Sequence, residues 1–172
     1  MKKILTLLFV FCGLLLAGQA MAQAKMPEDK SKRPSPPATV AGPGFTIDYS
    51  RPSLKGRKAF GGLEPYGKVW RTGANEATTF TTTKAVKING QALAAGTYAL
   101  FTIPGEQEWT IIFNKTAKQW GAYEYKQADD ALRVQVKPTK TAAPVEQFTI
   151  AADKAGLVTL AWDNTQAAFT VK

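Results

Sequence analysis

The stretch FTIDYS, residues 45–50, alternates apolar and polar side chains along its whole length. Three apolar side chains fall on one face of an extended chain, namely Phe45, Ile47 and Tyr49. Neighbouring side chains of a strand point to opposite faces of its sheet, so the pattern predicts a strand with one face in a core and the other in water. Strands of this kind are typical of antiparallel sheets, which can leave one face solvated.

The same alternation recurs along the chain in short stretches bounded by turn residues. These are AVKI (85–88), QAL (91–93), TYALFTI (97–103), EWTIIF (108–113), LRVQVK (132–137), FTI (148–150), LVTLAW (157–162) and AFTVK (168–172). Asn89-Gly90 suits the positive φ angles of a type I′ turn and predicts a hairpin. No segment carries a helical stripe over three turns, although residues 124–133 could form a short helix. About nine short strands predict an all-β, antiparallel β-sandwich of jelly-roll or immunoglobulin-like type.

The N-terminus has the three parts of a secretory signal peptide. Lys2 and Lys3 precede an apolar run over residues 4–17, and the small residues Ala20 and Ala22 follow it. The run is shorter than the roughly 20 residues that a spanning helix needs. We therefore expect a signal peptide over residues 1–22, a periplasmic or secreted protein, and no transmembrane segment after cleavage.

The proline content and polarity of the chain after residue 22 predict where the leader ends and the folded domain begins. Residues 23–32 are polar and predict a flexible leader, and residues 33–172 predict a single sandwich domain. From Arg33 onward the prolines favour an extended chain that could lie along a sheet edge.

Composition excludes several kinds of chemistry. The chain has no histidine, and its only cysteine, Cys12, lies in the signal peptide. A Ser-His-Asp triad, a cysteine nucleophile and a histidine or cysteine zinc site are therefore excluded, and we expect no cofactor and no metal. Basic residues exceed acidic ones by 22 − 13 = 9, and by seven without Lys2 and Lys3. This charge suits an anionic partner or solubility alone, whereas the export signal disfavours nucleic acid.

The segment from Arg51 to Glu76 mixes basic, aromatic and glycine residues and is the candidate site. Tyr66 and Trp70 could stack on a flat ligand, and guanidinium groups could hold a carboxylate or phosphate. The candidate ligand-binding residues are Arg51, Arg57, Tyr66, Trp70, Arg71, Asn75 and Glu76. In the structural alternative, Trp70 is core and Arg71 pairs with Glu76 across a tight turn.

A second set of aromatic residues also has both a structural and a functional interpretation. Trp109, Trp120 and Tyr123 could belong to the core or form a second stacking platform. Glu124, Asp129 and Asp130 could bind calcium but lack the regular spacing of a calcium loop.

Four stretches carry a family resemblance. YSRPSLKGRKAFGGLEPYGKVWRTGANEATTF (49–80), AGTYALFTIP (95–104), EWTIIFNK (108–115) and QWGAY (119–123) resemble the bacterial secreted domain of unknown function 2911 family. The resemblance extends from about RPSPPATV, residues 33–40, to the C-terminus. It implies an exported bacterial protein and supplies no catalytic or ligand-binding residues.

Three functions fit these observations. The first is a non-enzymatic binding module for an anionic or hydroxylated ligand such as a glycan, and the second is a structural or assembly protein of the cell envelope. The third is a carboxylate-dependent glycan hydrolase that uses Glu76 with Asp48 or Glu64. That chemistry needs two carboxyl groups facing one bond, about 5 Å or about 6.5–9.5 Å apart. An open carboxylate pair would favour the hydrolase, and a fully packed Arg51–Glu76 segment would favour the structural role.

The signal peptide gives the first testable prediction. We expect the mature protein to begin at Gln23, because Ala20 and Ala22 satisfy the small-residue rule of signal peptidase. Intact mass of protein recovered from the periplasm or medium measures this directly. Full-length chain in the cytoplasm would contradict the prediction.

Overall fold

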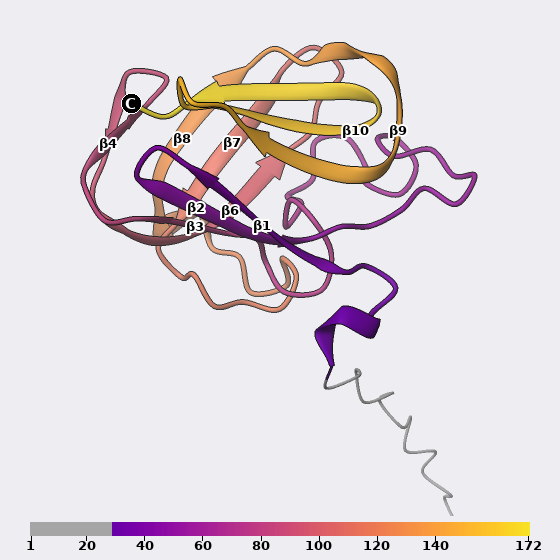
Figure 1. Ribbon diagram of the computed structural model, residues 1–172, viewed down its shortest axis with the longest axis horizontal. Coiled ribbons are helices and arrows are strands. Elements are labelled where there is room, and N and C mark those ends of the chain that lie inside the picture. The colour runs from indigo at the N-terminus through magenta and orange to yellow at the C-terminus, as the bar shows by residue number, and fades with distance from the viewer. Residues whose placement is uncertain (1–28) are drawn as a thin grey trace, which may run out of the picture.

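The computed structural model describes residues 29–172, so the expected signal peptide and most of the expected leader lie outside the described residues. The fold is an all-β antiparallel sandwich, as predicted, with ten strands (Figure 1). Two short 3-10 turns accompany them, η1 (Lys30–Lys32) and η2 (Gln127–Asp129). Within residues 29–172, no helix is long and apolar enough to cross a membrane.

The first layer is a six-stranded sheet in the order β1-β2-β3-β6-β7-β8. Its strands are β1 (Pro37–Gly42), β2 (Phe45–Ser50), β3 (Thr79–Thr82), β6 (Gly96–Ile103), β7 (Trp109–Asn114) and β8 (Asp130–Val136). The proline-led strand β1 lies at the sheet edge, where a missing backbone N–H costs no ladder hydrogen bond. The expectation that the chain after Arg33 follows a sheet edge is thereby confirmed.

The second layer is built on the long hairpin of β9 (Thr139–Ala152) and β10 (Leu157–Thr170), orange to yellow in Figure 1. The short hairpin of β4 (Val86–Ile88) and β5 (Gln91–Leu93) joins it through a bridge between Ile88 and Val171. Between them, Asn89 and Gly90 have φ angles of 46° and 85°, which confirms the predicted type I′ turn.

The core lies between the two layers and is rich in aromatic rings. The apolar faces of the predicted strands meet there, and Phe45, Ile47 and Tyr49 are all buried. The largest side chains form one contact group over both layers: Phe60, Trp70, Trp109, Phe148 and Trp162. Because the chain has no disulfide to restrain it, burial of this apolar surface is the main source of its stability.

Strands β9 and β10 differ from the sequence prediction. LVTLAW and AFTVK were expected to form separate strands, but both belong to the fourteen-residue β10, and FTI is part of the equally long β9. The register of the pair shifts on both sides of Asp163, whose φ is 56°. A bulge of this kind lets the strand continue through the polar stretch DNTQ (163–166), which otherwise favours a turn.

Two smaller features also differ from expectation. The polar stretch TFTT, which gave no strand signal, forms the central strand β3 because β2 and β6 hydrogen-bond to it on both sides. The short helix expected within residues 124–133 is only the 3-10 turn Gln127–Asp129.

Two glycines with the same backbone angle give a matched stability test. Gly90 and Gly156 have φ angles of 85° and 84°, but a Cβ at Gly90 meets open space, whereas one at Gly156 overlaps the carbonyl oxygen of Val171. We expect Gly90→Ala to lower the free energy of unfolding by about 1 kcal/mol through backbone strain alone. Gly156→Ala should cost about 2–4 kcal/mol, because the overlap adds to that strain.

Urea unfolding of the two variants beside wild type measures the difference. Equal losses for both variants would show that the close approach of Gly156 to the C-terminal strand has no energetic weight.

Candidate functional site

The segment between Arg51 and Glu76 closes one end of the sandwich and contacts both layers. The backbone N–H groups of Gly67 and Trp70 donate to Pro104 and Thr102 of the first layer, at 2.8 and 2.7 Å. The N–H of Leu54 donates to Glu146 of β9 at 2.9 Å. A chain without disulfides thus uses this segment to tie its layers together.

The two aromatic candidates of this segment are packed. Trp70 is only 2% exposed, and its indole N–H donates to the carbonyl of Gly73 at 3.0 Å. Its ring stacks on Trp162 with centroids 5.8 Å apart. Tyr66 is partly buried against the same core. Trp70 is therefore core, as the structural alternative proposed, and the expectation that it stacks on a ligand is wrong.

Two arginine candidates bind the protein's own backbone. Arg51 donates from Nε to Phe148 O at 3.2 Å and from Nη2 to Thr149 Oγ1 at 2.9 Å. Arg57 donates from Nε to Leu54 O at 2.9 Å and from Nη2 to Ser53 O at 3.2 Å. These bonds hold loop conformations, so neither guanidinium is free for the bidentate grip on an anion that the sequence suggested.

Arg71 does not pair with Glu76, which corrects the second half of the structural alternative. The charge of Arg71 acts instead on Glu64, and Arg71 Nε is buried without a hydrogen-bond partner in the described part of the chain. Burial raises the pKa of Glu64 to about 7 even though Arg71 acts to lower it. Glu64 thus prefers its neutral form more than an exposed carboxyl does.

The partners of Glu76 come from the N-terminal segment. Arg33 Nη1 donates to both carboxylate oxygens, at 3.0 and 2.8 Å, and Lys30 Nζ lies 3.4 Å from Oε1. Partial burial acts to raise the pKa of Glu76, but the hydrogen bond from Arg33 and the charge of Lys30 hold it below its usual value. Lys30 was expected in a flexible leader, yet it lies in the turn η1 and contacts Glu76.

Glu76 also lines a groove formed by two adjoining pockets, which we call the Glu76 groove. Both pockets share Glu76, Ala77 and Thr79. One has a volume of about 200 Å³ and its other lining residues are Lys30, Pro37, Asp48, Tyr49 and Ser50. The second has a volume of about 350 Å³ and its other lining residues are Ala117, Lys118, Gln119 and Trp120.

The groove lies on the outer side of the six-stranded sheet. Asp48 alternates with the inward-facing Ile47 and Tyr49 of β2, so its side chain faces away from the main core. Ala77 packs on Phe101 and Ile112 in a second, smaller apolar cluster. Of the seven candidate residues, Glu76 alone is among those that line the two pockets.

Asn75 has a positioning role beside the groove. Its φ is 62°, and its side-chain amide donates to Ser35 O at 3.2 Å. Its carbonyl accepts the N–H of Gly121 at 3.1 Å. Asn75 thus joins the N-terminal segment to the loop that carries Trp120.

The loop over residues 115–126 forms the other wall of the groove and exposes two aromatic rings. Ala77 N–H donates to Gln119 O at 3.0 Å, which seats the loop against the Arg51–Glu76 segment. Trp120 is 48% exposed and Tyr123 is 84% exposed, whereas Trp109 is buried in the main core. Trp109 is therefore core, whereas Trp120 and Tyr123 are exposed on the loop.

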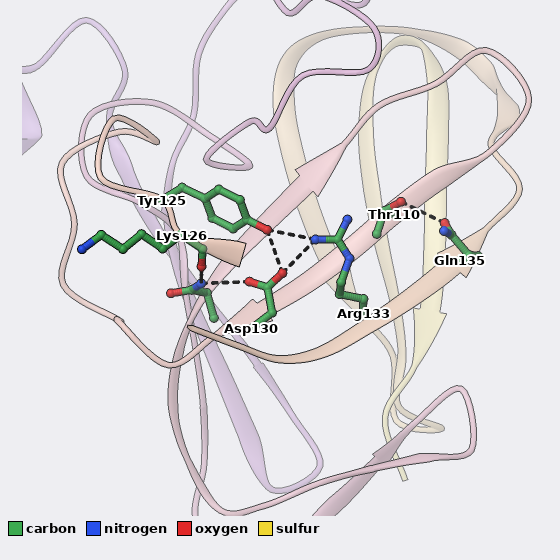
Figure 2. A network of polar contacts seen from close by, with 7 residues as sticks. Thr110, Tyr125, Lys126, Asp130, Arg133 and Gln135 are labelled. Carbon is green, nitrogen blue, oxygen red and sulfur yellow. Dashed lines mark hydrogen bonds and ion pairs between the residues drawn. The ribbon is translucent and has the colours of Figure 1, made fainter. Parts of the chain in front are cut away.

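A buried carboxylate anchors this loop at its far end (Figure 2). Asp130 Oδ1 accepts from Asn114 Nδ2 at 2.8 Å, and Oδ2 accepts from the Tyr125 hydroxyl at 2.7 Å and from Arg133 Nη1 at 2.8 Å. Burial, together with Asp130, raises the pKa of Tyr125 to about 12, so its hydroxyl stays a donor. Asn114 also donates to Lys126 O at 3.0 Å, which fixes the end of the loop.

The same contacts decide the calcium alternative. Three donors already occupy Asp130, and residues 29–172 contain no group of three acidic, histidine or cysteine side chains that could hold a metal. Asp129 and Asp130 instead accept hydrogen bonds from neighbouring side chains, and no acidic group of this kind forms in the described part of the chain.

The groove contains two of the three carboxyl groups that the sequence offered for glycoside hydrolysis. Asp48 and Glu76 both line it, but the lowered pKa of Glu76 keeps it ionised at neutral pH. Asp48 accepts a hydrogen bond from the Thr39 hydroxyl. Glu64, the carboxyl with a raised pKa, is not among the lining residues. The acid and the second carboxylate of such a mechanism are therefore not found together.

Comparison with known proteins agrees with the sequence resemblance. The sequence model of the family described as "Protein of unknown function (DUF2911)" matches residues 31–171, and the chain belongs to this family. No curated protein and no solved structure matches the chain. The match begins at the residues that form η1, so the segment that carries Arg33 is part of the family's domain.

The Arg33–Glu76 pair predicts a pH-dependent loss of stability. The side chain of Arg33 is only 9% exposed, so loss of the Glu76 charge leaves a nearly buried guanidinium with a weaker acceptor. Glu76→Gln should lower the free energy of unfolding by about 1–2 kcal/mol at pH 7. The folded pKa of Glu76 is lowered, so its contribution is complete above the unfolded value near 4.5 and is lost as pH falls through the folded pKa.

Urea unfolding at pH 7 and at successively lower pH tests this prediction. The gap between wild type and Glu76→Gln should narrow as pH falls below 4.5 and close in strong acid. In an Arg33→Ala background the same substitution should cost less at pH 7, since the partner is gone. A gap that persists in strong acid, or additive effects of the two substitutions, would contradict the pairing.

Proposed function

We propose that this DUF2911 protein is a non-enzymatic binding module whose ligand is a hydroxylated ring compound, such as a glycan, bound in the Glu76 groove. The observation that carries the proposal is the half-exposed indole of Trp120 at the rim of the groove. An indole of this size normally lies in a core, and a large apolar group left open beside a concavity marks a binding surface.

The Trp120 end of the groove offers shape and apolar contact. Ala77, Ala117 and the stem of Lys118 line this part together with Trp120. A sugar ring presents a flat face of C–H groups, which an indole contacts well while its N–H can still bond to a hydroxyl. Tyr123, three residues further along the same loop, is 84% exposed and is a second aromatic side chain open to solvent.

The Glu76 end offers hydrogen-bonding groups of both kinds. Asp48 and Glu76 present acceptors for ligand hydroxyl groups, and Lys30 presents a donor. Since Glu76 is held by Arg33 from one side, its carboxylate is fixed before any ligand arrives. Fixed polar groups beside an apolar surface are the usual basis of specificity in small-ligand sites.

Binding has better support than hydrolysis or a purely structural role. A glycosidase needs a carboxylic acid as its proton donor, but the pKa of Glu76 in the groove is lowered, and Glu64, whose pKa burial raises, is not among the residues that line the groove. A purely structural protein has no need for an exposed indole beside a groove. The predicted signal peptide puts the proposed ligand outside the cytoplasm, in the periplasm or the medium.

Trp120 gives the test of this function. The experiment is calorimetric titration of the protein with a panel of cello-, chito- and xylo-oligosaccharides and oligogalacturonate. We expect wild type to bind at least one of them, and Trp120→Ala to weaken that binding by about 30-fold, as loss of a central aromatic contact does. Trp120→Phe should keep part of the affinity, because a flat ring remains.

Leu157→Ala is the matched control, since Leu157 is also an exposed apolar side chain, at 40%, but lies on β10 in the other layer. It should bind as wild type does. Binding by no member of the panel, or equal losses for Trp120→Ala and Leu157→Ala, would contradict the proposal.

A further inference from the structure

A second feature, independent of the Glu76 groove, is the turn KGRK at residues 55–58. All four of its residues are exposed, although Leu54 before it and Ala59 and Phe60 after it are buried. The segment that follows β2, purple in Figure 1, runs outward past the ends of the strands. The turn is therefore held between buried anchors and carries three exposed cationic residues, Lys55, Arg57 and Lys58, at one end of the sandwich.

Hydrogen bonds make the turn rigid. The N–H of Arg57 donates to Leu54 O at 3.1 Å, and its guanidinium donates to Leu54 O and Ser53 O at 2.9 and 3.2 Å. Lys55 and Gly56 have φ angles of 50° and 75°, the left-handed conformation of a tight turn. Arg57 thus fixes the turn and contributes its charge, and the two lysines are exposed, with Lys58 Nζ lying beside Gly61 of the same loop.

The carboxylates at the base of the turn accept backbone hydrogen bonds. Glu146 Oε1 accepts the N–H of Lys55 at 2.8 Å, and Asp163 Oδ2 accepts the N–H of Ala59 at 3.1 Å. The ion pairs found within residues 29–172 do not include Lys55, Arg57 or Lys58. Within this part of the chain, their charges are therefore not directly paired with carboxylates.

The nearby acid does little to reduce this charge. Glu64 belongs to the same loop, and burial raises its pKa to about 7, so it is only partly ionised at neutral pH. Glu146 and Asp163, which accept backbone N–H groups at the base of the turn, offset part of the charge of the three cations, and the balance of these groups is positive.

We propose that the KGRK turn docks the protein on an anionic lipid surface. A lysine is a point charge on a flexible stem and fits a fluid layer of headgroups, whereas recognition of a defined anion uses a free guanidinium fork. Here the guanidinium of Arg57 is turned back onto the loop. The large exposed apolar side chains of the described residues are Trp120, Tyr123 and Leu157, so the turn has no aromatic platform for an acidic polysaccharide.

Vesicle sedimentation tests the docking surface. The probes are vesicles of phosphatidylglycerol mixed with phosphatidylcholine and vesicles of phosphatidylcholine alone, at about 50 mM salt, where exposed charges are weakly screened. We expect wild type to sediment with the anionic vesicles only. The double variant Lys55→Gln/Lys58→Gln should bind them about 20-fold more weakly, since each lysine near such a surface contributes about fivefold.

The matched control is Lys84→Gln/Lys154→Gln, which removes the same charge from two other exposed positions. It should bind within about twofold of wild type, and both double variants should melt as wild type does, because all four lysines are exposed. Equal losses in the two double variants would overturn the proposal in favour of net charge alone. Retention on heparin without binding to anionic vesicles would overturn it in favour of an acidic polysaccharide.

Discussion

The position of Trp70 between the two layers, with its indole packed on one layer and its backbone paired with the other, is the constraint on which the rest of the structure depends. Its ring stacks on Trp162 of β10 and meets Phe148 of β9 with centroids 4.9 Å apart, while its backbone pairs with Thr102 of β6. A sandwich without disulfides gains its stability from burial between its layers. Placing this one residue also places the whole segment from Arg51 to Glu76, which explains why that segment is rich in glycine and in turn-forming residues.

The candidate groove follows from that placement together with two polar anchors. Arg33 holds the Glu76 carboxylate from the N-terminal side, and Asp130 holds the far end of the 115–126 loop through Asn114, Tyr125 and Arg133. The carboxylates of Glu76 and Asp130 each accept hydrogen bonds from more than one donor. Their oxygen atoms therefore have partners where they are shielded from water. The groove walls are therefore fixed by charge pairing, whereas the sandwich beneath them is fixed by apolar packing.

The two proposed surfaces use different physical means and lie on different segments. The Glu76 groove combines a half-exposed indole with fixed carboxylates, an arrangement suited to a ligand with a ring and hydroxyl groups. The KGRK turn combines flexible lysines with a stiffened backbone, an arrangement suited to a diffuse layer of negative charge. Because the two surfaces lie on different segments, the proposals allow the turn to hold the protein at an anionic surface while the groove stays open.

The sequence by itself determined the fold class, because the signals for it are local. The alternation in FTIDYS and LRVQVK and the Asn89-Gly90 turn depend on neighbouring residues, and all three appear as predicted. The site was decided only by tertiary structure. The sequence named Glu76 as a candidate and, in the structural alternative, paired it with Arg71, five residues away, whereas its partner is Arg33, forty-three residues away. Likewise, QWGAY signals two aromatics, but whether Trp120 is core or open depends on how the 115–126 loop seats against Ala77. The alternation of apolar and polar side chains along a strand is set by neighbouring residues in the sequence. The exposure of a side chain and its charge partner are set by the distant segment that the fold packs against it.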